Sequence, residues 1–169
     1  MPTLRTLVCL GLVLGLVTGC GGKKKEITSL QRKEAATLDS EAQFALTLKD
    51  YARAEGLLAK AAELTPDNAD LWLRLGMTRM RIEQREPARA AYKRGLDALR
   101  EAAAEQKDNA DLLLQQVTAL ALLGRQDEAK KLVEKLGKDF PQHRAVRAFI
   151  DGRTLDRMLA DPQFKALAL

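Results

Sequence analysis

The sequence predicts an all-α fold built from consecutive pairs of packed helices. Apolar residues recur at helical spacing within 67–99, where Leu71 and Leu75 share one face and Ala88, Tyr92 and Leu96 recur every fourth position. The same pattern returns in the stretches 35–68 and 110–143. The sequence offset between equivalent residues is longer from the second copy to the third than from the first copy to the second. Aromatic residues are only 4% of the chain while alanine and leucine abound, which suits packed helices rather than a sheet.

The repeated unit has a characteristic set of bulky and small residues. Trp72, the pair Leu75-Gly76, Ala88 and Tyr92 resemble the signature of the tetratricopeptide repeat, a helix-turn-helix unit of about 34 residues. One unit cannot bury its own apolar face, so the resemblance implies an α-solenoid of about three stacked units. These units are expected at residues 35–68, 69–102 and 110–143, with a helix extension at 103–109.

Individual helices follow from local signals. Thr28 and Gln31 have the spacing of a capping box, and Gly124 supplies a turn. Arg100 occupies the position in the second unit that is equivalent to Pro66, the proline that ends the first unit. Because no proline stops it there, the helix before the third unit can continue through the seven extra residues. The expected helices are 28–48, 52–64, 69–82, 85–106, 110–123, 126–138 and 144–150.

Residues 144–169 are expected to cap the last unit, because a solenoid must cover its terminal apolar face. Within the expected capping helix, Val146, Phe149 and Ile150 should turn inward. The residues that follow are too apolar for a solvated tail, so we expect them to dock on the third unit: Leu155, Met158, Leu159, Phe164 and Leu167.

Residues 1–19 have the form of a signal peptide, with Arg5 before an apolar run from Leu7 to Val17. The run ends in Leu-Val-Thr-Gly-Cys, which resembles the lipobox of bacterial lipoproteins and implies that Cys20 is lipidated. The alternative is an ordinary secretory signal with an incidental cysteine. Residues 20–27 would form a short basic tether, either solvated or touching anionic headgroups through Lys23 to Lys25.

The cysteine count agrees with lipidation. Of the two cysteines, Cys9 lies within the signal segment, so the processed chain would keep only Cys20 and form no intramolecular disulfide. Gly21 follows the lipidated position, and in lipoproteins of two-membrane bacteria the lack of Asp there accompanies sorting to the outer membrane. By this resemblance we expect a bacterial cell-envelope protein, anchored in the outer membrane and facing the periplasm.

Nothing in the sequence indicates catalysis. His143 is the only histidine, so no cluster of histidines can bind a metal, and the sequence indicates neither a His-based triad nor a glycine-rich phosphate loop. We therefore predict no enzyme, no catalytic residue, no cofactor and no metal. The net charge of +5 is mild, and its only basic run, Lys23 to Lys25, has no aromatic stacking platform, which disfavours nucleic-acid binding.

The resemblance places a protein-binding groove along the first helix of each pair. The family's carboxylate clamp is not reproduced, because Asp39 and Asp111 stand where two of its lysines would lie. Two methionines, Met77 and Met80, would suit an adaptable apolar partner, although core filling is the alternative for both. The groove residues we select are Leu46, Leu73, Met77, Met80, Arg81, Leu114, Thr118 and Leu122; Asp39, Gln43, Thr47, Asp70, Asp111 and Ala121 share that face.

The predicted function is that of a membrane-anchored adaptor or scaffold without enzymatic activity. Its partner would be a peptide or helix of another envelope protein, in outer-membrane, pilus, secretin or cell-wall complex assembly. The alternative is a self-associating structural lipoprotein whose groove is filled by its own C-terminal tail.

Overall fold

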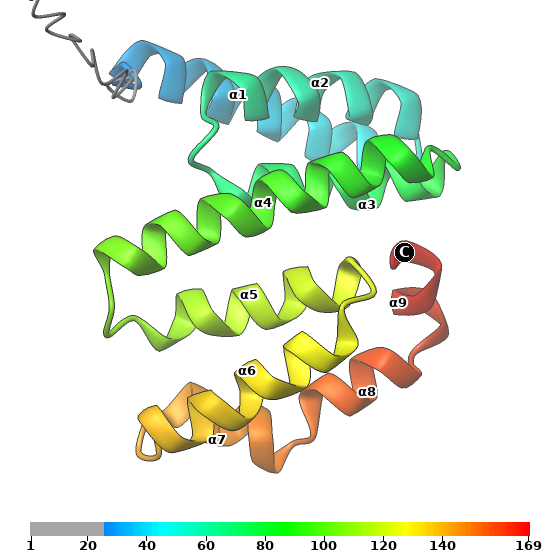
Figure 1. Cartoon of the computed structure of the whole chain (residues 1–169). Helices are drawn as coiled ribbons and strands as arrows, with labels where there is room; N and C mark the ends of the chain where they lie inside the picture. Colours follow the sequence, from blue (N-terminus) through cyan, green and yellow to red (C-terminus); the bar gives the residue numbers. More distant parts are fainter. Residues whose placement is uncertain (1–25) are drawn as a thin grey trace, which may run out of the picture.

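The computed structural model describes residues 26–169, and these form nine helices and no strand (Figure 1). Three consecutive helix pairs stack on one another, and three shorter helices follow the last pair (Figure 1). This architecture confirms the predicted all-α solenoid. The helices are α1 (Ser29–Thr47), α2 (Tyr51–Leu64), α3 (Ala69–Arg81), α4 (Arg85–Glu105), α5 (Ala110–Leu122), α6 (Gln126–Asp139), α7 (Arg144–Asp151), α8 (Thr154–Ala160) and α9 (Pro162–Leu167).

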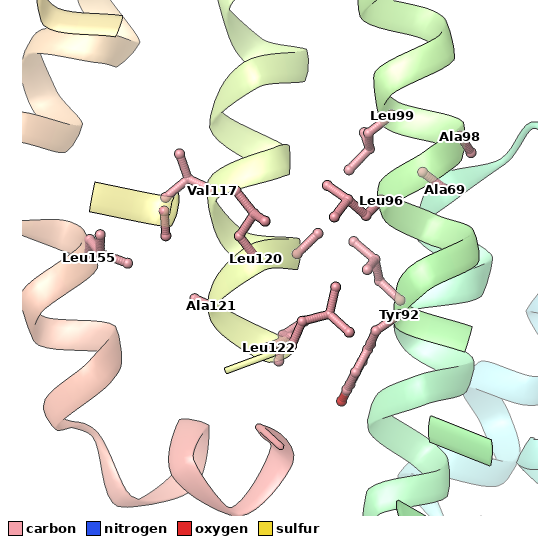
Figure 2. Close-up of a cluster of buried hydrophobic side chains, with 14 of the residues drawn as sticks. Ala69, Tyr92, Leu96, Ala98, Leu99, Val117, Leu120, Ala121, Leu122 and Leu155 are labelled. Carbon is pink, nitrogen blue, oxygen red and sulfur yellow. The ribbon is translucent and has the colours of Figure 1, made fainter. Parts of the chain in front are cut away.

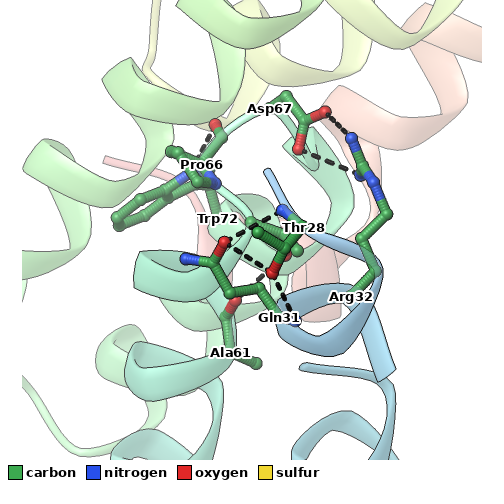
Figure 3. A network of polar contacts seen from close by, with 8 residues as sticks. Thr28, Gln31, Arg32, Ala61, Pro66, Asp67 and Trp72 are labelled. Atoms are coloured by element: carbon green, nitrogen blue, oxygen red, sulfur yellow. Dashed lines mark hydrogen bonds and ion pairs between the residues drawn. The ribbon is translucent and has the colours of Figure 1, made fainter. Parts of the chain in front are cut away.

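A capping box starts α1. The Gln31 backbone N–H donates to Thr28 Oγ1 over 3.2 Å, and the Thr28 backbone N–H donates to Gln31 Oε1 over 2.9 Å. Both bonds satisfy donors that the first turn of a helix leaves without partners. Figure 3 shows this box beside the turn between α2 and α3, where Arg32 pairs with Asp67 at 2.8 Å and Trp72 Nε1 donates to the Pro66 carbonyl at 3.1 Å. The start of α1 is therefore held against the turn that leads into the second helix pair.

The turn within each helix pair has one repeated geometry. A left-handed residue follows the first helix: Lys49 at φ 59°, Glu83 at φ 61° and Gly124 at φ 71°. The residue after it donates its N–H to a carbonyl five positions back, which closes the helix end with a Schellman-type bond. These bonds are Asp50 to Ala45, Gln84 to Arg79 and Arg125 to Leu120, each 2.9 Å. The steps from Lys49 to Glu83 and from Glu83 to Gly124 equal the two steps between the sequence repeats.

The longer second step is taken up by one helix. α4 has 21 residues, whereas α2 and α6, its counterparts in the neighbouring pairs, each have 14. The difference equals the seven extra residues and adds about 10 Å of helix. Seven residues make nearly two turns, so α5 begins in an orientation close to the one it would otherwise have.

Two apolar clusters form the core of residues 26–169. The first, between α1, α2, α3 and α4, is rich in alanine: Ala35, Ala42, Leu58, Ala61, Ala62, Leu71, Leu75 and Ala91. The second is larger and extends from α3 to α8, and Figure 2 shows Leu96 and Leu99 of α4 facing Leu120 of α5. Tyr92 and Leu122 belong to this second cluster (Figure 2).

The last three helices cover more of the molecule than predicted. Val146 of α7 is 1% exposed, whereas Ile150 is 38% exposed and so does not turn fully inward. α8 packs on α5 of the third pair, with Leu155 buried, as expected for a cap. α9, in contrast, packs on α3 of the second pair, so the expectation that the whole tail docks on the third unit is corrected. The chain turns back across the ends of α5 and α3 (Figure 1).

Candidate protein-binding groove

A groove of about 360 Å³ lies where the end of α1, α3 and α9 meet. Leu46 of α1 and Met77 of α3 provide apolar surface within it, and Leu167 of α9 stands on its other side. Its remaining lining residues are Thr47, Lys49, Tyr51, Arg74, Thr78 and Arg81. It lies on the side of the solenoid formed by the first helices of the first two pairs, as the tetratricopeptide resemblance implies.

An ion pair between α1 and α3 holds one wall of the groove. Arg74 of α3 pairs with Asp39 of α1 through a short contact, and its guanidinium also lies 3.6 Å from Asp70. The side chains of Arg74 and Asp39 are 17% and 25% exposed, so this pair is partly shielded from solvent screening. Asp39, which the sequence placed on the groove face, thus positions α1 against α3 through Arg74, while Asp70 pairs with Arg74 within α3.

The charged side chains lining the groove in the described part of the chain are all cationic. Arg81 stacks its guanidinium over the Tyr51 ring, with 5.4 Å from Cζ to the ring centroid, and Lys49 lies at the adjacent turn. Arg74 is already matched by two carboxylates, so Lys49 and Arg81 dominate the local potential. An apolar floor beside two cations favours a ligand that carries both an apolar side chain and a carboxylate.

The selected groove residues do not all lie in this groove. Leu46, Met77 and Arg81 line it together. Leu114 and Thr118 of α5 are half-buried and lie outside it. Cys20 lies outside the described residues, so its lipidation remains a prediction.

Three other selected residues are in the core. Leu73 is 8% exposed because it packs against α4 at Gly95, whose small size lets the two helices approach closely. Met80 is 8% and Leu122 is 1% exposed, and both belong to the larger apolar cluster on which α9 packs. A position in this groove is therefore corrected for Leu73 and Leu122. Met80 is a core residue by its burial, as the core-filling alternative has it, but it also borders a hollow beside α9, whereas Met77 lines the groove itself.

Tyr92 joins the core to the C-terminal segment. The residue is 0% exposed, and its hydroxyl donates to the Leu167 carbonyl over 2.6 Å. Burial raises the pKa of the Tyr92 phenol, because the apolar surroundings disfavour the phenolate. A second backbone contact follows, in which the Leu169 N–H donates to the Leu122 carbonyl over 2.9 Å. The sequence indicated that the tail is apolar, but no local signal could identify these acceptors.

A second hollow, of about 550 Å³, lies on the other side of α9. It shares Tyr51, Arg81 and Leu167 with the groove and is otherwise lined by Met80, Glu83, Gln163 and Ala166. Leu167 and the Arg81–Tyr51 pair thus stand between two adjoining depressions. α9 occupies part of a wider concave surface.

No group of three or more His, Cys, Asp or Glu side chains within residues 26–169 is placed to hold a metal ion. His143 lies edge-on to Phe140 with ring centroids 6.4 Å apart, a packing contact. None of the helices in this part of the chain is both long enough and apolar enough to span a bilayer.

The geometry defines a class of protein with stacked helix pairs and a groove lined by the first helices. Residues 45–101 of this chain match the family model described as Tetratricopeptide repeat. The matched stretch runs from the end of α1 through most of α4 and includes Met77 and Arg81. No curated protein matches the chain. The family match and the helical architecture support a tetratricopeptide repeat protein, and such repeats are typically non-catalytic modules for protein–protein interaction.

Proposed function

We propose that this protein is a lipid-anchored adaptor of the bacterial cell envelope. It binds a short segment of another envelope protein in the groove between α1, α3 and α9. The observation that carries this proposal is the groove lining, where Leu46 and Met77 offer apolar surface beside the cations Lys49 and Arg81. The segment that fits best carries an apolar side chain next to a carboxylate, because it gains apolar burial and a charge-assisted contact together.

The position of the groove is consistent with a membrane-anchored adaptor. Cys20 precedes Thr28 by eight residues, a tether that spans at most about 28 Å. α1 then runs from Ser29 to Thr47, and Leu46 lies about 26 Å along it. An anchor at Cys20 would therefore hold the start of α1 near the bilayer and leave the groove at the far end of that helix. Gly21 favours the outer membrane, with the domain in the periplasm.

Site-specific crosslinking in the native cell tests the groove. A photoreactive residue in place of Met77 should capture an envelope protein at a discrete mass, whereas the same group in place of Leu30 should not. Leu30 is a fair control because it is 72% exposed at the opposite end of α1. Equal capture from both positions, or none from Met77, would contradict the groove proposal.

A pair of charge reversals tests the chemistry of the partner. Arg81→Glu should abolish the Met77 crosslink, because it places a negative charge in the groove lining that repels an acidic segment. Arg85→Glu changes the net charge equally at an exposed residue outside the groove and should leave the crosslink intact. If both variants crosslink like the parent, the acidic character assigned to the partner is wrong.

The anchor has its own test. Cys20→Ser should block lipidation and move the protein from the membrane to the soluble fraction. Persistence of the variant in membranes after a salt wash would contradict anchoring by acyl chains.

The second candidate function is a self-associating structural lipoprotein. One observation favours part of it, since α9 occupies the concave surface beside α3. Sedimentation of the chain from residue 20 onward, carrying Cys20→Ser, separates the candidates. A concentration-dependent dimer supports self-association, and a monomer at all concentrations supports the adaptor.

A further inference from the structure

We infer that the concave surface beneath α9 is itself a docking surface. α9 covers this surface but can be displaced from it by a partner. The partner it fits is a short amphipathic helical turn with apolar residues three positions apart, like Phe164 and Leu167. This inference rests on the proposed function, because it extends the same binding face from α3 to α5.

The polar contacts that hold the tail do not depend on its side chains. The Tyr92 hydroxyl donates to the backbone carbonyl of Leu167, and the backbone N–H of Leu169 donates to the carbonyl of Leu122. Any segment ending a helical turn can offer the same carbonyl and N–H groups. The surface therefore recognises a backbone conformation with an apolar face, so a segment of different sequence can make the same bonds.

α9 is weakly buried compared with the surface that it covers. None of its six residues is buried, and only Phe164 and Leu167 among them are half-buried. Beneath it lie Tyr92, Met80 and Leu122, which are 0%, 8% and 1% exposed. A segment with few buried contacts opens at low free-energy cost, so α9 belongs to the least stable part of the tail.

The chain supplies a hinge between the stable and the displaceable parts of the tail. α8 is anchored by Leu155, which is 6% exposed and belongs to the larger core cluster. Asp161 then adopts an extended conformation at φ −65° and ψ 123°, and its carboxylate accepts the Gln163 N–H over 2.7 Å. α9 thus has its own cap and can leave the surface as a preformed turn while α8 stays in place.

Departure of α9 removes the wall between the two depressions. Leu167 lines both of them, and Tyr51 and Arg81 are common to both. Without Leu167, the groove beside Met77 continues past Arg81 to Met80. The methionine side chains at either end can repack around different apolar ligands. Occupancy by the tail lowers the apparent affinity of the surface for a partner by the fraction of time for which it is open.

The test uses a fluorescent synthetic peptide with the sequence of residues 161–169, DPQFKALAL. The protein is the chain from residue 20 onward with Cys20→Ser, which keeps every described residue. Leu167→Ser should release the tail, because it removes the apolar side chain that holds α9 on the surface. Lys165→Ser places the same residue at an exposed position of α9 and is the matched control.

The peptide should bind the Leu167→Ser protein about tenfold more tightly than it binds the parent, as expected for a site that the protein's own tail fills about nine-tenths of the time. The Lys165→Ser protein should behave like the parent. Phe164→Ser should repeat the effect of Leu167→Ser. Equal binding to the parent and to both released variants, or binding to none of them, would overturn the inference.

Two further measurements identify the contact and the occupant. Tyr92→Phe added to Leu167→Ser should weaken peptide binding, because the ring stays while the hydroxyl donor is lost. Excess peptide should speed hydrogen exchange at the Leu169 amide of the parent, because this amide is bonded to Leu122. A parent that sediments as a dimer, with its tail exchanged between copies, would instead assign the surface to a second copy and overturn the partner proposed here.

These outcomes are separable from those of the proposed function. The peptide experiment needs no envelope partner, so it can succeed where crosslinking from Met77 fails. The reverse result, a crosslinked partner with no peptide exchange, would keep the groove and remove the displaceable tail.

Discussion

The first and third helix pairs have the same turn geometry but very different surroundings. The first pair packs mainly through alanines, and the outer face of α1 and the turn after it leave Leu30, Phe44 and Leu48 at 72%, 60% and 62% exposure. The third pair packs through leucines and a valine as well as alanines, and it is covered by α7 and α8. Alanine contacts bring helices close together but bury few methylene groups. The repeat thus sets the geometry, while its neighbours set the stability of each pair.

The largest expected effect comes from the residue that links the second and third pairs. Tyr92→Ala should lower the free energy of unfolding by about 3–5 kcal/mol, the range for truncating a buried aromatic residue. Tyr51→Ala is the matched control, because Tyr51 is only partly buried and should matter much less. Urea denaturation of both variants measures the difference. Similar losses would contradict the central role of the α4–α5 core.

Two glycines should respond in opposite directions to the same change. A Cβ at Gly76 would lie 2.4 Å from Cδ1 of the Tyr92 ring, so Gly76→Ala should cost about 1–3 kcal/mol through overpacking. A Cβ at Gly56 would meet nothing within 4 Å, so Gly56→Ala should stabilise α2 by about 0.5–1 kcal/mol. Thermal melts of the two variants should move in opposite directions. Melts that move together would contradict this packing of α3 on α4.

Hydrogen exchange compares the two pairs directly. Amides of α5 should exchange more slowly than those of α1, because α5 lies between α4, α6, α7 and α8 while the outer face of α1 is exposed. Phe44→Lys should leave this order unchanged, since that side chain is already mostly solvated. Equal protection of α1 and α5 would show that the solenoid opens as one cooperative unit.

The smallest expected effect is a pH dependence within the third pair. Arg125 donates two hydrogen bonds of 2.6 Å to Glu128, and this contact lowers the pKa of the Glu128 carboxyl. Because the pKa of Glu128 is lower in the folded protein, its ionised carboxylate stabilises the fold at pH values above the ordinary pKa near 4.5. This stabilisation is lost as the pH falls through the pKa of the folded protein. Glu128→Gln should therefore be slightly destabilised at pH 7 and match the parent at about pH 2. Denaturation at both pH values would show this convergence.

Features that depend on nearby residues were predictable from the sequence. The capping box of Thr28 and Gln31, the turn at Gly124 and the two unequal steps between the repeats all follow from local chemistry or internal repetition. Lys49 and Glu83 were harder to identify as turn residues, because neither residue type favours a positive φ. Their role becomes visible only by alignment with Gly124.

The sequence by itself determined the all-α fold and its paired helices, and it placed Met77 and Arg81 on one helix face while leaving both groove and core open for Met77. Only the tertiary structure decided that Leu73, Met80 and Leu122 are core residues and that α9 lies on α3. Helical periodicity shows which side chains share a face, but it does not show which distant segment will cover that face. That choice depends on contacts such as the one from Tyr92 to the Leu167 carbonyl, made between residues 75 positions apart.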